Sequence, residues 1–357
     1  MDSILIYNIG CLISGNIHDP VLDADSLYIE DRCIREIGTD RSVADTVIDA
    51  MGKTVAPGLI DSHVHLSFGD WTPVQNATSW ISHYLHGGIT RMVSAGELHL
   101  PGLPIDHPDP DVFRSLAIVT RACYDNYRPS GVKVEAGTLL LVPGLKEADF
   151  EAVARAGSKV VKFIFYPYGE NPEEQANYLV WARKYGLKVK IHSGGVSRTG
   201  VSKPADAELV LGIEPDIAGH INGGPIPMSI PDMERVVAES KAYLEVAYCG
   251  NFTQALKLME MAVKQGQLNR VILGSDTPSG TGVTPRAMLR IMALVASADG
   301  IAPEQALCMA TGSPALAHGL DSGFIEPGKP ADLIILGKIQ GSVGARRYAV
   351  RAVGGRW

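Results

Sequence analysis

The sequence predicts an α/β protein, a (β/α)₈ barrel of the TIM type with a small β-sandwich domain formed from both chain ends. Short apolar runs alternate with helical patterns in the middle of the chain, and there are eight such runs. The 357 residues suffice for a barrel of about 250 residues and a smaller domain. We expect the barrel over 57–318 and the two parts of the small domain over 1–56 and 319–357.

Short strands separated by turns are predicted in the first fifty residues. Gly15-Asn16 and Glu30-Asp31 are turn signals, and Ala56-Pro57-Gly58 is a natural hinge. The segment 324–336, FIEPGKPADLIIL, reads as a turn and a strand that returns to this N-terminal part. The expected N-terminal strands are Ser3–Tyr7, Leu27–Glu30, Cys33–Ile37 and Thr46–Asp49.

The eight apolar runs of the middle region are mostly 25 to 30 residues apart, which favours parallel βαβ units. An open doubly wound sheet is the alternative, but no glycine-rich dinucleotide fingerprint supports it. The expected strands are Leu59–His65, Ile89–Ala95, Lys133–Leu141, Val160–Phe165, Lys188–His192, Ile217–His220, Tyr243–Ala247 and Val271–Gly274.

The clearest helix signal begins at Asn171-Pro172. Asparagine is a good N-cap, proline is favoured in the first turn, two acids follow, and Gly186 marks the end. The stretches 231–240 and 253–266 are further predicted helices.

Charge and composition restrict the function classes. The formal net charge is -7, which argues against nucleic-acid and anionic-membrane partners. The five cysteines are scattered and form no CxxC pair, so a disulfide framework is not expected. There is no signal-peptide pattern and no apolar run of about 18 residues, so we expect a cytoplasmic protein.

Histidines stand at the ends of several predicted strands. His63 and His65 are two residues apart, so a strand places both on one face, where neutral imidazoles can bind a divalent ion. An HxH alone is a weak signal, because two ordinary core or surface histidines are the more common explanation. Its position at the end of the first barrel strand, where active sites of this architecture lie, favours the metal.

Three further residues end predicted strands in the same way. His192 and His220 are each followed by glycine, which permits a tight turn, and Asp276 ends the eighth strand. A single histidine of this kind is more often structural, and the aspartate alone would read as a helix cap. Together at one mouth of a barrel they predict a metal or catalytic site.

A lysine completes the candidate site. Lys162 lies in the apolar fourth strand, and a buried lysine must lose its charge or gain a partner. It forms a salt bridge at the rim, or its amine reacts with CO₂ to give a carbamate that bridges two metal ions. Lys159 and Lys190 compete with it on sequence grounds.

These residues resemble the amidohydrolase superfamily, in which the order His63-x-His65, His192, His220 and Asp276 is matched on strands one, five, six and eight. The segments APGLIDSHVH (56–65) and PGKPADLIIL (327–336) are also typical of it. Within the superfamily, the chain is similar to enzymes that open a cyclic enamide. That narrower likeness rests on LHGG (85–88), SAG (94–96), RPSGVKV (128–134), HINGGP (220–225), CGN (249–251), GQL (266–268) and SDTPSGTG (275–282).

Two features depart from that pattern. Enzymes that open cyclic enamides are expected to bridge their metals with a glutamate on strand four, where this chain offers Lys162, in a context similar to the carboxylated lysine of hydantoinase-like enzymes. The family also continues its β-domain further past the ADLIIL strand, so we expect the C-terminal part of the small domain to be incomplete.

The resemblance implies a hydrolase for C–N bonds of cyclic amides, with two divalent metal ions. His63, His65 and Asp276 would bind one ion and His192 and His220 the other, with carboxylated Lys162 and a hydroxide between them. Zinc suits these ligands, and iron or manganese is an alternative. Asp276 would act as base and then acid. The alternatives are a heterocycle deaminase of the same superfamily and a non-catalytic barrel.

Substrate contacts are expected from Cys249, Asn251 and Ser279, which follow strands seven and eight; packing is an equal explanation for the first two. The expected partner is a small cyclic amide. The resemblance also implies a homotetramer.

Overall fold

The computed structural model describes residues 3–66, 80–97, 100, 102–164, 171–195, 204–223, 226–278 and 282–337. These residues form two compact units, which are the described parts of Met1–Ile60 with Leu289–Trp357, and of Asp61–Met288. The domain limits at 56/57 and 318/319 stay predictions.

The first unit contains a four-stranded sheet with the order β5-β4-β1-β6. All four strands predicted in this region are confirmed, and β1 pairs antiparallel with β4 and parallel with β6. The strands are β1 (Ser3–Tyr7), β4 (Leu27–Glu30), β5 (Cys33–Ile37) and β6 (Thr46–Asp49).

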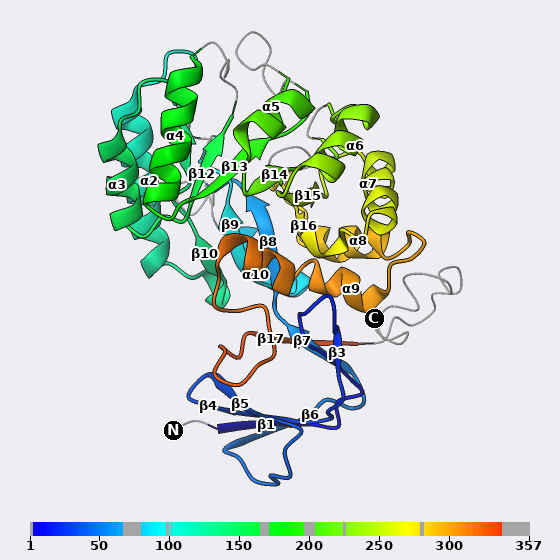
Figure 1. The fold of residues 1–357 in the computed structure, drawn as a ribbon. Helices are drawn as coiled ribbons and strands as arrows, with labels where there is room; N and C mark the ends of the chain where they lie inside the picture. Colours follow the sequence, from blue (N-terminus) through cyan, green and yellow to red (C-terminus); the bar gives the residue numbers. More distant parts are fainter. Residues whose placement is uncertain are drawn as a thin grey trace. The chain divides into compact units, whose positions relative to one another are not determined.

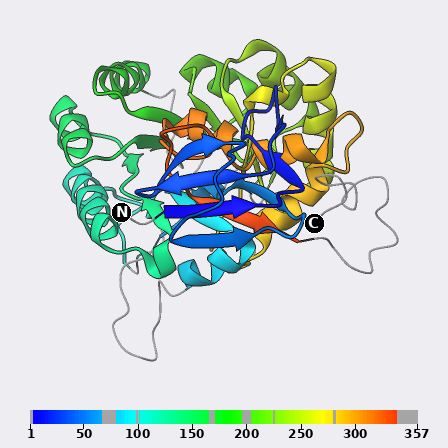
Figure 2. The same ribbon diagram turned by 90° about the horizontal axis from the view of Figure 1, so that it is seen from below.

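A second sheet of this unit joins segments from both regions of the chain. Its order is β17-β7-β2-β3, formed by β17 (Leu333–Leu336), β7 (Thr54–Pro57), β2 (Cys11–Ile13) and β3 (Val21–Leu22). Strand β17 pairs antiparallel with β7, so the predicted return of the 324–336 segment is confirmed. Figure 2 shows this strand in red among the blue N-terminal strands. Ile325 packs in one apolar cluster with residues such as Leu12, Leu27 and Ile34.

Parallel strands form the middle of the chain, in two sheets with the orders β10-β9-β8 and β11-β12-β13-β14-β15-β16. Each of the eight predicted runs contains a strand, and nearly all strand residues are buried because helices cover them. The strands are β8 (Leu59–Val64), β9 (Ile89–Ser94), β10 (Lys133–Glu135), β11 (Leu139–Leu141), β12 (Val160–Phe163), β13 (Lys188–His192), β14 (Ile217–Gly219), β15 (Tyr243–Ala247) and β16 (Val271–Gly274).

The third predicted run, expected as one strand over Lys133–Leu141, is instead divided into β10 and β11. Gly137 lies between them with φ +83°, a left-handed conformation that breaks the extended chain. A Cβ atom there would lie 2.6 Å from the carbonyl oxygen of Ala117, so only glycine fits this close approach. The single-strand prediction was wrong because hydrophobicity alone does not register such a break.

The first parallel strand is hydrogen-bonded to the segment that follows the last one. Val64 and Thr277 form a parallel bridge. The backbone N–H of Asp276 donates to the carbonyl of His63 at 2.8 Å, and that of His65 donates to the carbonyl of Thr277 at 2.7 Å. These bonds hold His63, His65 and Asp276 at one end of the parallel strands.

Consecutive helices from α2 to α7 pack against one another on the outer side of β12–β16 (Figure 1). The predicted helix start at Asn171 is confirmed, because its side chain accepts a hydrogen bond from the N–H of Glu174 at 3.2 Å. The helices are α1 (Trp80–Tyr84), η1 (Leu85–Gly87), α2 (Pro110–Asn126), η2 (Pro129–Gly131), α3 (Glu147–Arg155), α4 (Pro172–Lys184), α5 (Ala207–Ile213), α6 (Ile230–Glu239), α7 (Phe252–Lys264), η3 (Leu268–Arg270), α8 (Ala287–Val295), α9 (Pro303–Cys308) and α10 (Gly312–His318). Over the described residues, none of these helices has the length and apolar character needed to cross a membrane.

Candidate metal centre

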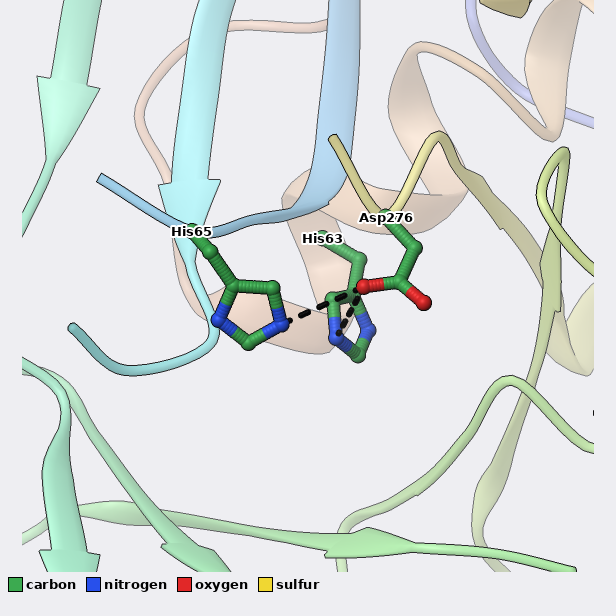
Figure 3. A group of neighbouring side chains, drawn as sticks. All are labelled: His63, His65 and Asp276. Carbon is green, nitrogen blue, oxygen red and sulfur yellow. Dashed lines mark ion pairs between the residues drawn. The ribbon is translucent and has the colours of Figure 1, made fainter. Parts of the chain in front are cut away.

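His63, His65 and Asp276 form a buried cluster at the ends of the first and last parallel strands (Figure 3). One potential ligand atom from each lies within 4.8 Å of the others. Oδ1 of Asp276 is 3.2 Å from Nε2 of His65 and 3.5 Å from Nε2 of His63. The structure therefore brings together three of the residues predicted to bind metal.

Hydrogen bonds on the far side of each imidazole fix its tautomer. Nδ1 of His65 lies 2.6 Å from the carbonyl oxygen of Gly96, and Nδ1 of His63 contacts the carboxylate of Glu245. Since a carbonyl and a carboxylate oxygen can only accept, both Nδ1 atoms carry the proton. The lone pair of each ring is therefore on Nε2, which faces Asp276.

This arrangement fits a cation. Two imidazole lone pairs and a carboxylate oxygen, all acceptors, point at one another in a buried space, which is unfavourable without a positive charge between them. Burial, together with the charge of Lys162, holds the pKa of His63 well below its usual range, so this ring stays neutral. Neutral imidazoles and carboxylate are suitable ligands for zinc and related divalent ions.

His192 and His220 lie next to this cluster, at the ends of β13 and β14. The ring centroids are 4.5 Å apart for His192 and His220, and 5.1 Å apart for His220 and His63. Burial lowers the pKa of His192 to about 4 and that of His220 to about 3, so both are neutral at physiological pH. Nδ1 of His220 is buried and has no hydrogen-bond partner among the described residues, as expected of an atom that binds a metal.

Two of these side chains are held by unusual backbone. Asp276 has φ +58° and His220 has φ +36°, in the region that non-glycine residues rarely adopt. Such conformations persist where the surroundings enforce them, and they are common at functional sites.

The structure distinguishes the three lysines that the sequence offers as candidates for the site. Lys162 is buried with Nζ 3.1 Å from Nε2 of His63, inside the histidine cluster. Lys190 is its register partner on β13, but Nζ of Lys190 lies 2.5 Å from Oε2 of Glu245. Lys159 is partly exposed and pairs with Glu135. Burial, followed by the charge of Lys190, lowers the pKa of Lys162 to about 7, which makes a nucleophilic neutral amine accessible.

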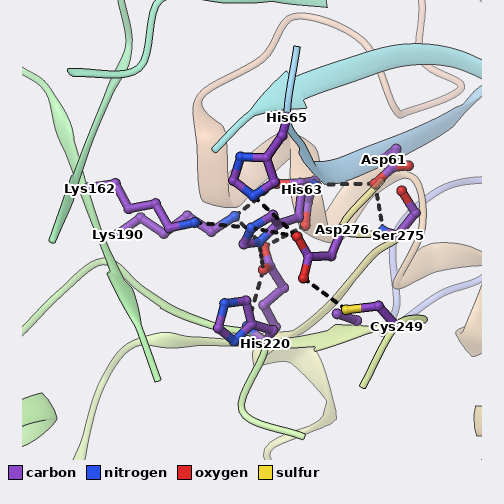
Figure 4. Close-up of polar contacts among 12 residues, drawn as sticks. Asp61, His63, His65, Lys162, Lys190, His220, Cys249, Ser275 and Asp276 are labelled. Atoms are coloured by element: carbon purple, nitrogen blue, oxygen red, sulfur yellow. Dashed lines mark hydrogen bonds and ion pairs between the residues drawn. The ribbon is translucent and has the colours of Figure 1, made fainter. Parts of the chain in front are cut away.

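Two acidic residues of the site were missed by sequence reasoning. Glu245 contacts His63, and Oδ1 of Asp61 accepts hydrogen bonds from the backbone N–H groups of Ser275 (2.8 Å) and His63 (3.2 Å). Figure 4 shows Asp61 beside the cluster. A lone acid within a predicted strand of the barrel, as in YLEVA and LIDSHV, is the signal that indicates such a residue, because a buried carboxylate needs partners.

The three expected substrate contacts have different surroundings. Sγ of Cys249 lies 2.8 Å from Oδ2 of Asp276, so it does reach the cluster (Figure 4). The side chain of Asn251 caps α7 by accepting from the N–H of Gln254 at 3.1 Å. Ser279 lies outside the described residues.

Known proteins resemble this chain over nearly its whole length. It is 43% identical to enamidase of Eubacterium barkeri over 99% of this chain and 92% of that protein. The crystal structure of an enamidase, described as a member of the amidohydrolase superfamily, superposes with a TM-score of 0.90 at 42% identity, covering 99% of this chain and 91% of the other. Residues 238–355 match the Amidohydrolase family.

More distant proteins share the fold or part of the sequence. Imidazolonepropionase of Geobacillus kaustophilus is 26% identical over 88% of this chain and 84% of its own length. A putative prolidase from Bifidobacterium longum has a TM-score of 0.64 at 16% identity, covering 94% and 88% of the two chains, which is a likeness of fold alone. From its full-length identity with enamidase, the chain belongs to the amidohydrolase superfamily.

Proposed function

We propose that this chain is an enamidase-like amidohydrolase that opens a cyclic enamide or related cyclic amide at a centre of two divalent metal ions. The observation that carries the proposal is the convergence of His63 Nε2, His65 Nε2 and Asp276 Oδ1 in a chain 43% identical to enamidase. The reaction adds water across the ring amide, so the C–N bond breaks and a carboxylate forms.

The donor set divides into two groups. His63, His65 and Asp276 would hold one ion, and His192 and His220 the other. Lys162, as its carbamate, would bridge them, because its amine lies inside the cluster while that of Lys190 is paired with Glu245. Zinc suits these ligands, with iron or manganese as alternatives. When bound, the ions lower the pKa of water toward neutrality and polarise the amide carbonyl.

Asp276 performs the proton transfer. Its carboxylate begins the reaction ionised and is only 6% exposed, so it accepts a proton from the attacking water and not from bulk solvent. It then gives this proton to the departing ring nitrogen, acting as base and then as acid. The contact with Cys249 orients the carboxylate while the two imidazoles face its other oxygen.

We also propose an arrangement for the whole chain. The parallel strands close into a (β/α)₈ barrel over 57–318, because β8 is hydrogen-bonded to the segment after β16. The residues 1–56 and 319–357 form a small β-sandwich domain. We further propose a cytoplasmic homotetramer whose substrate contacts include Cys249, Asn251 and Ser279.

The test combines metal content with product analysis. Purified protein, expressed with bicarbonate and zinc, iron and manganese, is measured by plasma mass spectrometry and then incubated with cyclic enamides, lactams and hydantoins. About two ions per chain and a ring-opened carboxylate are expected. Ammonia release from a heterocyclic amine with the ring intact would instead indicate a deaminase. Protein without metal or turnover would indicate a non-catalytic barrel.

A further inference from the structure

Glu245 and Lys190 form an ion pair in the interior of the Asp61–Met288 unit, and both side chains are 0% exposed. Nζ of Lys190 lies 2.5 Å from Oε2 of Glu245 and donates to the carbonyl oxygen of Ser62 at 2.9 Å. The hydroxyl of Ser62 donates to the same Oε2 at 2.8 Å. One oxygen of Glu245 is thus held by two donors.

The other oxygen of Glu245 faces the candidate metal centre. Oε1 accepts from Nδ1 of His63, and from the backbone N–H of His220 at 3.2 Å. His63 belongs to β8 and His220 follows β14, so one carboxylate on β15 contacts residues of both proposed metal sites.

We infer that Glu245, oriented by Lys190, is a positioning residue that prepares the metal centre, an inference that rests on the proposed function. Because the carboxylate can only accept, it keeps the proton of His63 on Nδ1 and turns the Nε2 lone pair toward the cluster. It also holds the backbone of His220 at its positive φ.

Stability alone does not explain this pair. Buried ion pairs are often no more stabilising than apolar residues of the same size. The four donors that meet Glu245 come from Ser62, His63, Lys190 and His220, three of which are proposed ligands or precede one directly. The space is closely fitted, since a Cβ atom on Gly219 would lie 2.8 Å from the carbonyl oxygen of Ile191 and 3.2 Å from Cε of Lys190.

Glu245→Gln gives a sharp test. The amide keeps the shape of the carboxylate but has one acceptor and one donor. Its oxygen remains with the charged Lys190 ammonium, which is a stronger donor than the backbone N–H of His220 on the other side, and the NH₂ group turns to His63. Nδ1 of His63 must then accept, so the proton moves to Nε2, the atom that faces the cluster.

The experiment has two readouts. Nitrogen NMR of ¹⁵N-histidine-labelled metal-free protein reports the His63 tautomer, with the signal assigned by a His63→Gln variant. Competition titration with Zn²⁺ reports affinity. We expect Nδ1–H in the wild type, Nε2–H in Glu245→Gln, and a loss of zinc affinity of about 10- to 100-fold in that variant.

Two further variants separate positioning from folding. Glu135→Gln removes a carboxylate from another part-buried ion cluster, with Arg91, Arg121 and Lys159, and should keep full zinc affinity. The double variant Lys190→Met/Glu245→Leu removes both charges, which preserves folding, and should still lose zinc affinity. If Glu245→Gln does not fold, the zinc affinity of the double variant tests the positioning role.

The outcomes are distinguishable. An unchanged His63 tautomer in Glu245→Gln, or wild-type zinc affinity in either folded variant, would overturn the positioning role. A wild-type protein that binds no zinc would overturn the proposed metal function instead, and the tautomer measured without metal would still decide the role of Glu245.

Discussion

Sγ of Cys249 lies 2.8 Å from Oδ2 of Asp276, on the side of the carboxylate opposite to the two imidazoles. Oδ1 faces His63 and His65, so the two oxygens of Asp276 have different surroundings. Since a thiol next to an ionised carboxylate donates its proton, Cys249 orients the group to which we assign the proton transfer. Burial, followed by the charge of Asp276, raises the pKa of this thiol, which keeps it in the donor form.

Substitution of Cys249 should therefore reduce turnover without releasing metal. In Cys249→Ala the carboxylate loses this thiol donor, and we expect kcat to fall about ten-fold, the size of a hydrogen bond to a charged group. Cys249→Ser keeps a donor and should retain most of the activity. Steady-state kinetics and metal content measure both. Equal kcat in the Ala and Ser variants would contradict an orienting role.

Replacement of Asp276 should have a larger effect. Asp276→Asn removes the proposed proton acceptor and one proposed charged ligand, so we expect kcat to fall by about 10²- to 10⁴-fold. Chelation of the wild-type enzyme should abolish activity, and Zn²⁺ should restore it. Activity that survives chelation, checked by the metal content of the same sample, would rule out a metal-dependent reaction.

Lys162→Ala should lose metal and activity together, because the proposed carbamate bridge would be absent. Short carboxylic acids should partly restore both by taking the place of that anion. Lys159→Ala is the matched control, since this lysine lies on the same segment but pairs with Glu135 outside the cluster. A Lys162→Ala protein that keeps two ions per chain would show that this residue does not bridge them.

A buried carboxyl that is not among the proposed ligands gives a pH dependence of stability. Glu97 is 1% exposed, accepts a hydrogen bond from the Ser94 hydroxyl at 2.6 Å, and has its pKa raised by burial to about 7 from its ordinary 4.5. The folded protein keeps a proton that the unfolded chain releases between these values. The free energy of unfolding therefore falls as the pH rises from 4.5 to 7.

Glu97→Gln removes this titration while keeping a neutral group of the same shape. We expect the variant to be more stable than the wild type by roughly 1–3 kcal/mol at pH 8, with the difference vanishing near pH 4.5. Urea denaturation of metal-free protein at both pH values measures it. Glu135→Gln is the opposite control, because burial raises the pKa of Glu135 but Lys159 and Arg121 outweigh it, giving a net lowering. A Glu97 variant with a pH-independent difference would contradict the buried ionisation.

The clustering of the candidate site residues could be predicted because these residues stand at strand ends. His63, His192 and His220 each follow an apolar run, and parallel strands bring their carboxyl ends to one edge. The contact of Glu245 with His63 could not be predicted. Nor could the different surroundings of Lys162, which lies beside His63, and Lys190, which pairs with Glu245. They depend on which side chains meet across neighbouring strands, and this requires the register that places Lys162 opposite Lys190.

The prediction of the strands was likewise limited by what apolar patterns alone reveal. Apolar runs such as Val271–Gly274 gave strand boundaries that agree with the structure, because a strand buried on both faces is mostly apolar. The strands β2, β3 and β7 were missed. β2 and β3 have only three and two residues, too few to show a periodicity, and β7 ends in the Ala56-Pro57 pair that was interpreted as a hinge. The break between β10 and β11 depends on one glycine approaching the helix beside it.

The pairing of β7 with β17 affects the order in which the chain can fold during its synthesis. Val55 is opposite Ile335, so β7 cannot pair with β17 until β17 has been translated, after all the parallel strands. Until then, β7 has an unpaired edge, a feature that invites association between nascent chains. The parallel strands and their helices, whose contacts lie mostly between neighbours in sequence, are free to assemble first. We expect the proposed metal ligands to be gathered before β17 pairs with β7, so that this sheet forms after the parallel strands.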